Sequence, residues 1–213
     1  QLMRKMCFIA DVAILPRWMK VRNALDFVQG VHPNFERNKA MNFLAKTNIT
    51  LNSKIKTLSK GMIVQLHLAL VMAIDVDILI LDEPTLGLDI LYRKQFYQNL
   101  LNDYFNEQRT IIVTTHQVEE IEHILTDLLI IDKGKIILDC SMEEIGKQYI
   151  QVIAAPDSLE TLKQLKPLSL QKQFGQTQFL FENVDSSKLA ELGKLSTPSI
   201  SDVFVAKISG EQS

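Results

Sequence analysis

The sequence predicts an α/β protein built on a parallel β-sheet, and three observations support this fold class. Continuous apolar runs, typical of strands covered on both faces, occur at residues 6–10, 77–82 and 110–115. Segments whose apolar residues recur at helical steps separate these runs. Regular alternation of strands and helices is typical of a parallel sheet with helices packed against it.

The predicted helices differ in how much of their surface is apolar. The segment from Ser59 to Ile74 is apolar on all sides, which predicts a buried helix that begins after a serine cap. The other helices have a polar face. In chain order, the helical segments are residues 21–28, 34–46, 59–74 and 90–105.

After Asp127 the pattern changes to two short strands joined across Lys133 and Gly134, which predicts a β-hairpin. Ser141 and Glu144 then form the pattern of a capping box at the start of a short helix. We expect a small α+β appendage from about Gly146 onward.

Composition limits the classes of protein that the chain can be. It is 46% hydrophobic and 23% charged, the balance of a globular protein with a real core. A net charge of -2 argues against nucleic-acid binding through a broad basic surface. The two cysteines, Cys7 and Cys140, form no CxxC pair, so we expect reduced thiols in the cytosol.

The apolar runs are far shorter than the roughly 20 residues that a membrane-spanning helix needs, so a membrane role must come through a partner. The chain begins at Gln1 with neither an initiating Met nor a signal segment, and we expect it to begin within a domain.

Two adjacent carboxylates, Asp82 and Glu83, follow the apolar run at residues 78–81. Ligands of open α/β sheets bind at the carboxyl ends of the strands, where these acids lie. Consecutive strand residues point to opposite sides, so the two acids have different tasks. Asp82 suits Mg²⁺, and Glu83 suits the activation of a water that attacks a γ-phosphate. The alternative is that both acids only solvate the turn before Pro84.

Three further pieces add to this site. Ser59 can cap a helix that Gly61 brings close to a ligand, which leaves backbone N–H groups for an anion. The alternative is a helix cap without a ligand. His116 follows the strand at 110–115 and reaches the same sheet edge, although a lone histidine there is usually structural. A tight loop at residues 84–89 ends in Asp89.

In order and spacing, these pieces resemble the ABC ATPases over about residues 1–145. The family's glutamine loop corresponds here to Asp11, and its signature corresponds to Leu58, Ser59, Lys60, Gly61 and Met62. Its Walker B strand with the glutamate corresponds to residues 78–83, its D-loop to residues 87–89 and its switch histidine to His116. The resemblance implies a P-loop NTPase-like sheet with a helical signature subdomain at residues 17–75, core strands at 76–145 and a C-terminal extension at 146–213.

The resemblance also implies roles for single residues. Asp82 would bind Mg²⁺, Glu83 would act as the general base and His116 would sense the γ-phosphate of ATP. Ser59 and Gly61 would touch the ATP held by a second cassette, and Asp89 would couple the two sites.

Three departures limit what the resemblance implies. No segment of the 213 residues matches the P-loop pattern GxxxxGK[ST], so we expect the chain alone to bind ATP poorly. The signature has Lys60 and Met62 where the commonest form of the family has Gly and Gln; similar lysine-containing signatures occur in exporters of the ABC-2 type. Asp11 replaces the usual glutamine; a carboxylate can bind Mg²⁺ but cannot donate a hydrogen bond as an amide does.

The function implied is that of an ATPase subunit that dimerises on ATP and drives a separate membrane permease, peripheral to the inner face of the plasma membrane and without nucleic acid. The alternative is a regulatory or structural subunit without a P-loop that lends its signature to a competent cassette. Tandem cassettes of translation or DNA-repair ATPases are absent, and the signature helix disfavours a helicase. Trp18 and Met19 suit either a permease interface or the core.

Overall fold

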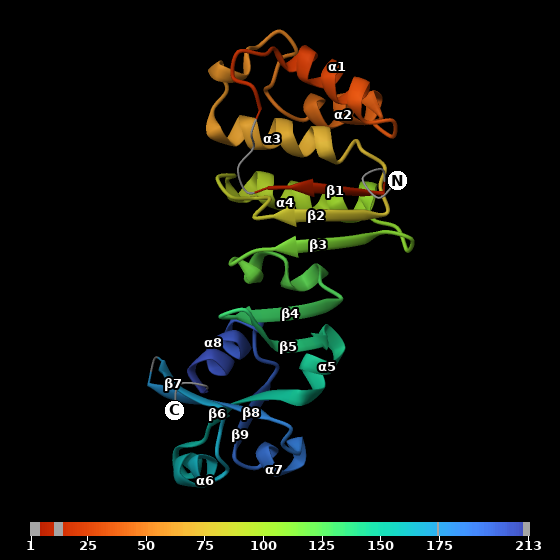
Figure 1. Ribbon diagram of the computed structural model, residues 1–213. Helices are drawn as coiled ribbons and strands as arrows, with labels where there is room; N and C mark the ends of the chain where they lie inside the picture. Colours follow the sequence, from red (N-terminus) through yellow and green to blue (C-terminus); the bar gives the residue numbers. More distant parts are fainter. Residues whose placement is uncertain (1–4, 11–14, 174, 211–213) are drawn as a thin grey trace. The chain divides into compact units, whose positions relative to one another are not determined.

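The computed structural model describes residues 5–10, 15–173 and 175–210 (Figure 1). The chain forms two compact units, Gln1–His116 and Gln117–Ser213. The expected boundary near residue 145 does not coincide with this division, so the separation into domains 1–145 and 146–213 remains a prediction.

The first unit contains the elements in which the predicted site lies. In chain order these are β1 (Met6–Ile9), α1 (Val21–Val31), α2 (Arg37–Ala45), a 3-10 turn (Ile55–Thr57), α3 (Lys60–Val71), β2 (Ile78–Asp82), α4 (Ile90–Asn99), a π-helical turn (Leu100–Tyr104) and β3 (Thr110–Thr114). Figure 1 shows α1, α2 and α3 grouped together. Residues of α4 line a pocket together with residues of α2 and α3.

The sheet of the first unit has the order β1-β2-β3, and both pairs of strands are parallel. The predicted α/β class is therefore confirmed. The central strand β2 is the best buried, with Leu79 and Leu81 at 1% and 0% exposure. The prediction that β3 is a buried strand is wrong, because its residues are exposed or half-buried and Ile112 is 45% exposed.

The helix expected over residues 90–105 changes its hydrogen-bonding pattern near its end. Regular α-helix ends at Asn99, and a π-helical turn continues from Leu100 to Tyr104. Tyr104 is buried there, and its hydroxyl donates a hydrogen bond to the carbonyl oxygen of Ile74 at 3.0 Å. Such a turn contains one residue more than a turn of α-helix, so the spacing of apolar residues hardly differs between the two. Here the turn accompanies a tertiary contact that the sequence does not show.

Burial raises the pKa of Tyr104 to about 12, although the neighbouring Arg109 guanidinium, 4.6 Å from the ring centroid, opposes the shift. Because the folded-state pKa lies above the unfolded value near 10, the neutral phenol stabilises the fold below pH 10, and this contribution is lost as pH rises towards 12. We predict that alkaline spectrophotometric titrations of wild type and Tyr104→Phe differ by one tyrosinate that forms at about pH 12. If the variant instead lacked a tyrosinate that forms near pH 10 in the wild type, this assignment would be contradicted.

The second unit is an α+β arrangement around an antiparallel sheet of order β7-β8-β6-β9, with a separate hairpin of β4 and β5. Its strands and helices are β4 (Asp127–Asp132), β5 (Lys135–Ser141), α5 (Met142–Gln148), β6 (Tyr149–Ala154), α6 (Leu159–Gln164), β7 (Ser169–Gln173), β8 (Gln176–Glu182), α7 (Ser186–Ala190), β9 (Gly193–Ser196) and α8 (Ile200–Gly210). Short 3-10 turns lie at Val118–Glu120, Glu122–Ile124 and Pro156–Ser158.

The four-stranded sheet buries a separate hydrophobic cluster on each face. Leu180 packs with Val203 of α8 and with the β4–β5 hairpin, whereas Phe179 packs with Leu162 of α6 and Leu189 of α7. This alternation follows from the two-residue period of a strand. Packing of the hairpin onto the first cluster explains why it groups with the C-terminal residues.

Two local predictions for the second unit are confirmed. The hairpin turns at Lys133 and Gly134, which both have positive φ, as a two-residue hairpin turn requires. Ser141 accepts a hydrogen bond from the backbone N–H of Glu144, and the Glu144 carboxylate accepts one from the backbone N–H of Ser141.

Candidate functional site

The first unit brings together the carboxyl ends of β2 and β3. The register of the two strands places Asp82 beside Thr114, whose hydroxyl donates a hydrogen bond to the Asp82 carboxylate. The backbone N–H of Glu83 continues the ladder by donating to the carbonyl oxygen of Thr114 at 2.9 Å. Parallel pairing of two strands therefore produces the acidic edge that the sequence predicted.

Glu83 turns back over the end of β3. Its φ of 44° lies in the left-handed region, which few non-glycine residues adopt, and the chain changes direction at this point. Its carboxylate accepts hydrogen bonds from the Thr115 hydroxyl at 3.0 Å and from the backbone N–H of His116 at 2.9 Å. The His116 ring nitrogen Nδ1 lies 2.6 Å from Glu83 Oε1.

This network determines which of the two side chains can move. The Glu83 side chain is 22% exposed and its two oxygens share three contacts, whereas the His116 ring is 67% exposed. A carboxylate held in this way has a defined orientation. The exposed imidazole can change its partner at lower cost, because it keeps contact with water.

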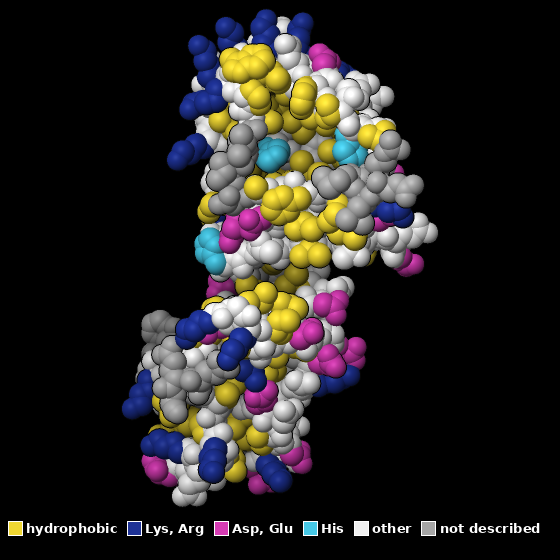
Figure 2. All heavy atoms as spheres, in the orientation of Figure 1, with side chains coloured by type: hydrophobic (Ala, Val, Ile, Leu, Met, Phe, Trp, Pro, Cys, Tyr) yellow, Lys and Arg dark blue, Asp and Glu magenta, His cyan; other side chains and the backbone are white. Residues whose placement is uncertain are grey.

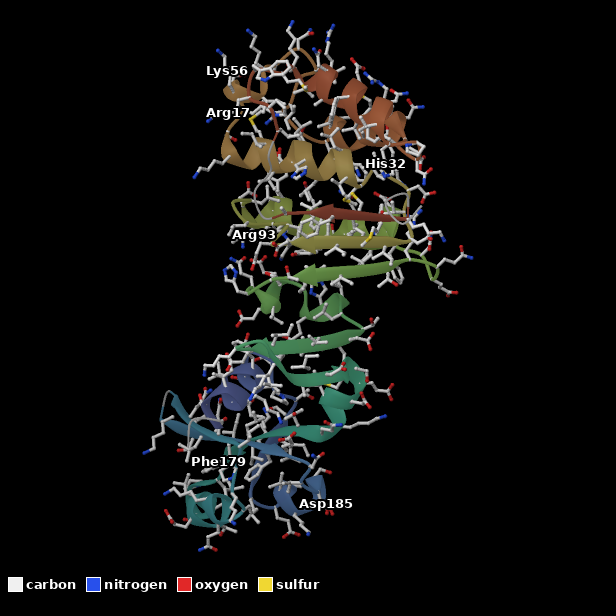
Figure 3. All side chains as sticks on the ribbon, in the orientation of Figure 1. Arg17, His32, Lys56, Arg93, Phe179 and Asp185 are labelled. Atoms are coloured by element: carbon white, nitrogen blue, oxygen red, sulfur yellow. The ribbon has the colours of Figure 1, made fainter. Side chains whose placement is uncertain are left out.

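The loop between β2 and α4 is tied to the core and to the helix that follows it. Thr85 is buried, and its hydroxyl lies 3.3 Å from the Tyr97 hydroxyl of α4. The Arg93 side chain, labelled in Figure 3, donates from Nε to the carbonyl oxygen of Leu88 at 2.8 Å. Asp89 caps α4 by accepting a hydrogen bond from the backbone N–H of Tyr92 at 3.0 Å. The loop is therefore held at both ends.

The predicted signature residues surround the start of α3. Ser59 is the N-cap, and its hydroxyl accepts a hydrogen bond from the backbone N–H of Met62 at 3.2 Å. Leu58 is only 7% exposed, so it acts through packing, whereas Lys60 is exposed. The start of a helix leaves backbone N–H groups without intrahelical partners, which suits an anion.

Gly61 lies against the loop that leads to Asp89. A Cβ added at Gly61 would lie 3.5 Å from the carbonyl oxygen of Gly87, which is an ordinary van der Waals contact. Gly87 itself has a φ of +86°, so this position needs glycine for its backbone conformation. The chain's own packing therefore does not require glycine at position 61.

The structure forms two groups from the predicted residues. Asp82, Glu83 and His116 make one group at the strand ends. The other consists of Ser59, Lys60, Gly61 and Met62 at the start of α3 beside the loop that ends in Asp89. Asp11 lies outside the described residues.

Sequence reasoning missed three residues of this site. Thr114 and Thr115 supply hydroxyl donors to Asp82 and Glu83, and hydroxyl residues at the end of an apolar strand were the available signal. His67 of α3 lines a small cavity together with Glu83 and Pro84. Burial lowers the pKa of His67, so the neutral ring is favoured there. The sequence did not indicate His67 as a site residue, because it lies within an apolar helix.

Comparisons with known proteins find relatives among the ATP-binding proteins of transporters. A family model described as "AAA domain, putative AbiEii toxin, Type IV TA system" matches residues 20–122, just under half of the chain. The chain is 24% identical over 90% of its length to the ABC transporter ATP-binding protein YtrB of Bacillus subtilis (strain 168). It is 32% identical over 79% of its length to the Nod factor export ATP-binding protein I of Cupriavidus metallidurans.

The chain covers 68% of the first of these relatives and 59% of the second. A solved structure, "Structure of ATP binding subunit of ABC transporter", superposes with a TM-score of 0.59 at 20% identity. The match covers 68% of this chain and 62% of the chain in that structure. This likeness agrees with the α/β fold class. No helix among the described residues is long and apolar enough to cross a bilayer.

Proposed function

Because the chain belongs to the ATP-binding proteins of ABC transporters, we propose that it is an ATP-hydrolysing subunit. In this proposal, ATP is sandwiched between two cassettes and its hydrolysis drives a separate membrane permease. The observation that carries the proposal is the network at the strand ends, where Thr115 and His116 orient the carboxylate of Glu83. The protein would act at the cytoplasmic face of the membrane.

In the proposed reaction Glu83 accepts a proton from the water that attacks the γ-phosphate of ATP. The Thr115 hydroxyl and the backbone N–H of His116 hold the carboxylate in one orientation, which lowers the cost of reaching a reactive geometry. His116 contacts Glu83 through Nδ1, and we assign its second ring nitrogen to the γ-phosphate. The exposed position of the ring is compatible with that second contact.

Asp82 and Thr114 have the ligand chemistry that Mg²⁺ requires. Both bring oxygen atoms to the strand ends, and the Asp82 carboxylate supplies the negative charge. Mg²⁺ commonly binds through one or two carboxylates together with substrate phosphates and water. The bound ion would neutralise charge on the phosphates, and Asp82 would hold it at the sheet edge. The contribution of Asp11 to this ion remains a prediction.

The start of α3 would serve the nucleotide of the second cassette. The Ser59 hydroxyl, the backbone N–H groups after it and the exposed Lys60 together favour an anion at this helix end. Asp89, at the end of the adjoining loop, would couple this half-site to the other nucleotide. Each ATP would then contact residues from two chains.

No segment of the 213 residues matches the pattern GxxxxGK[ST], and this feature of the sequence favours a different function. In this alternative the subunit lends Ser59, Gly61 and Asp89 to a competent cassette and hydrolyses nothing itself. Both functions require the helix end at Ser59, but only the first requires Glu83.

We predict that isothermal titration calorimetry of the 213-residue chain with Mg²⁺-ATP shows no saturable binding. Without a P-loop, neither backbone N–H groups nor a lysine enclose the β- and γ-phosphates. Tight binding by this chain would contradict the prediction and would require another phosphate site. The Asp82→Asn variant is the matched control for heat that arises from Mg²⁺ binding alone.

We predict that Gly61→Ala leaves folding unchanged or slightly improved and impairs ATP hydrolysis in the cassette dimer. A Cβ at this position makes only an ordinary contact in the chain, and alanine favours a helix by up to about 1 kcal/mol over glycine. The same methyl group would occupy space that we assign to the partner's γ-phosphate. Thermal unfolding and steady-state ATPase rates are the two measurements.

Gly30→Ala in α1 is the control for this substitution, because a Cβ at Gly30 meets nothing within 4 Å. It should leave both stability and activity intact. Equal ATPase rates for Gly61→Ala and Gly30→Ala would remove Gly61 from the half-site.

A further inference from the structure

Two segments of the first unit form a basic edge that lies outside the proposed nucleotide site. The backbone N–H of Lys56 donates to the carbonyl oxygen of Arg17 at 2.9 Å, and Lys20 lies opposite Lys54 in an antiparallel β-bridge. Arg22 follows at the start of α1 and binds the Asn52 side chain. We define the basic edge as Arg17, Lys20, Arg22, Lys54 and Lys56.

The charges of the basic edge are not compensated within the described residues. All five side chains are exposed, and none of them pairs with a carboxylate of residues 5–10, 15–173 or 175–210. Neither residues 15–25 nor residues 50–60 contain an Asp or a Glu. Lysines directly opposite in a bridge repel each other, so this arrangement favours an anionic partner. A chain of net charge -2 therefore has a local concentration of positive charge.

One large aromatic side chain lies within this edge. Trp18 follows Arg17 and is 73% exposed. Of the two positions that the sequence left open, this exposure excludes the core and leaves an interface. Figure 2 shows Lys and Arg side chains gathered around exposed hydrophobic atoms on this part of the first unit, and Figure 3 labels Arg17 and Lys56 on the same side. The indole can therefore contact apolar atoms of a partner while the neighbouring cations contact its negative charges.

We propose that the basic edge binds the anionic headgroups of a membrane surface, with Trp18 inserted at the headgroup level. Lysine and arginine can extend their charged ends towards headgroups while their stems cover apolar atoms. Tryptophan is enriched at the interface between lipid and water. A nucleic acid would favour several aromatic rings for stacking, and the edge offers one. This direct contact with lipid does not require ATP hydrolysis. If Trp18 contacted only the permease, the chain alone would bind vesicles of neither composition, and that result would overturn the proposal.

The proposal is tested by co-sedimentation of the chain with vesicles of phosphatidylcholine alone and of phosphatidylcholine mixed with phosphatidylglycerol. We expect binding only to the mixed vesicles, and weaker binding as salt is raised. Each cation near an anionic surface strengthens partitioning by about fivefold, so Lys54→Gln/Lys56→Gln should weaken it by about 25-fold. Lys54→Arg/Lys56→Arg should restore binding.

The matched control is Lys172→Gln/Lys194→Gln, which removes the same charge from exposed strand positions of the second unit. It should bind the vesicles as wild type does. Equal weakening by both double variants would overturn the proposal, because it would show an effect of net charge alone. Equal binding to both kinds of vesicle would overturn it as well.

Trp18 is the only tryptophan of the chain, so its fluorescence reports on this edge directly. Mixed vesicles should shift its emission to shorter wavelengths, and vesicles of phosphatidylcholine alone should not. If a short single-stranded oligonucleotide bound to the edge and mixed vesicles did not, nucleic acid would replace lipid as the partner. Circular dichroism of each variant verifies that the chain remains folded.

Discussion

Glu83→Gln is expected to slow ATP hydrolysis by about 10²- to 10⁴-fold in a cassette dimer that contains this chain and a phosphate loop, which is the scale of a positioned general base. The amide keeps the size of the carboxylate: its one oxygen can still accept the hydrogen bond from the backbone N–H of His116, and its NH₂ group can donate to the Thr115 hydroxyl. It cannot accept a proton from water at neutral pH. Nucleotide binding should therefore persist while turnover falls, and both are measured with the same dimer.

Glu119→Gln is the control for this substitution, since Glu119 is an exposed acid a short distance along the chain. It should leave the rate of hydrolysis unchanged. An unchanged rate in Glu83→Gln would remove the general-base role. If Gly61→Ala impaired the dimer at the same time, the alternative of a non-hydrolysing subunit that lends its signature would be favoured.

Leu79→Ala is expected to lower the free energy of unfolding of the first unit by about 2–5 kcal/mol, the usual range when a buried leucine is truncated. Leu79 is 1% exposed in the central strand, with strands paired on both sides, so the surrounding structure cannot easily collapse into the cavity. Urea denaturation followed by circular dichroism measures the change. The loss is a large share of the 5–15 kcal/mol that typically stabilises a domain.

Leu91→Ala is the matched control for that substitution, because Leu91 is 63% exposed on α4 and alanine also favours a helix. Its effect should lie within about 0.5 kcal/mol. Similar losses for Leu79→Ala and Leu91→Ala would contradict the assignment of β2 as the centre of the core.

The fold class and the acidic edge were readable from the sequence because both depend on local patterns. An apolar run that ends in Asp82 and Glu83 predicts a buried strand with two acids at its carboxyl end. The structure confirms that strand and its parallel partners. Ser141 and Glu144 were similarly predictable, since a capping box needs only residues three positions apart.

Other features depended on contacts between distant residues. The π-helical turn at Leu100–Tyr104 accompanies a hydrogen bond to Ile74, which is 30 positions away. The exposure of Ile112 on β3 depends on what packs against that face of the sheet, which one strand's sequence does not show. Trp18 had no periodic pattern around it that could separate a core position from an exposed one.

By itself, the sequence determined which residues we propose for the chemistry: Asp82 and Glu83 at a strand end, a serine-capped helix and a histidine after the next strand. Only the tertiary structure decided that Thr114, Thr115 and His116 supply the donors that orient those acids. It also decided that Arg17 and Lys56 adjoin in one basic edge. The physical reason is that strand periodicity and helix caps act between near neighbours, whereas sheet register and chain crossings bring together residues tens of positions apart.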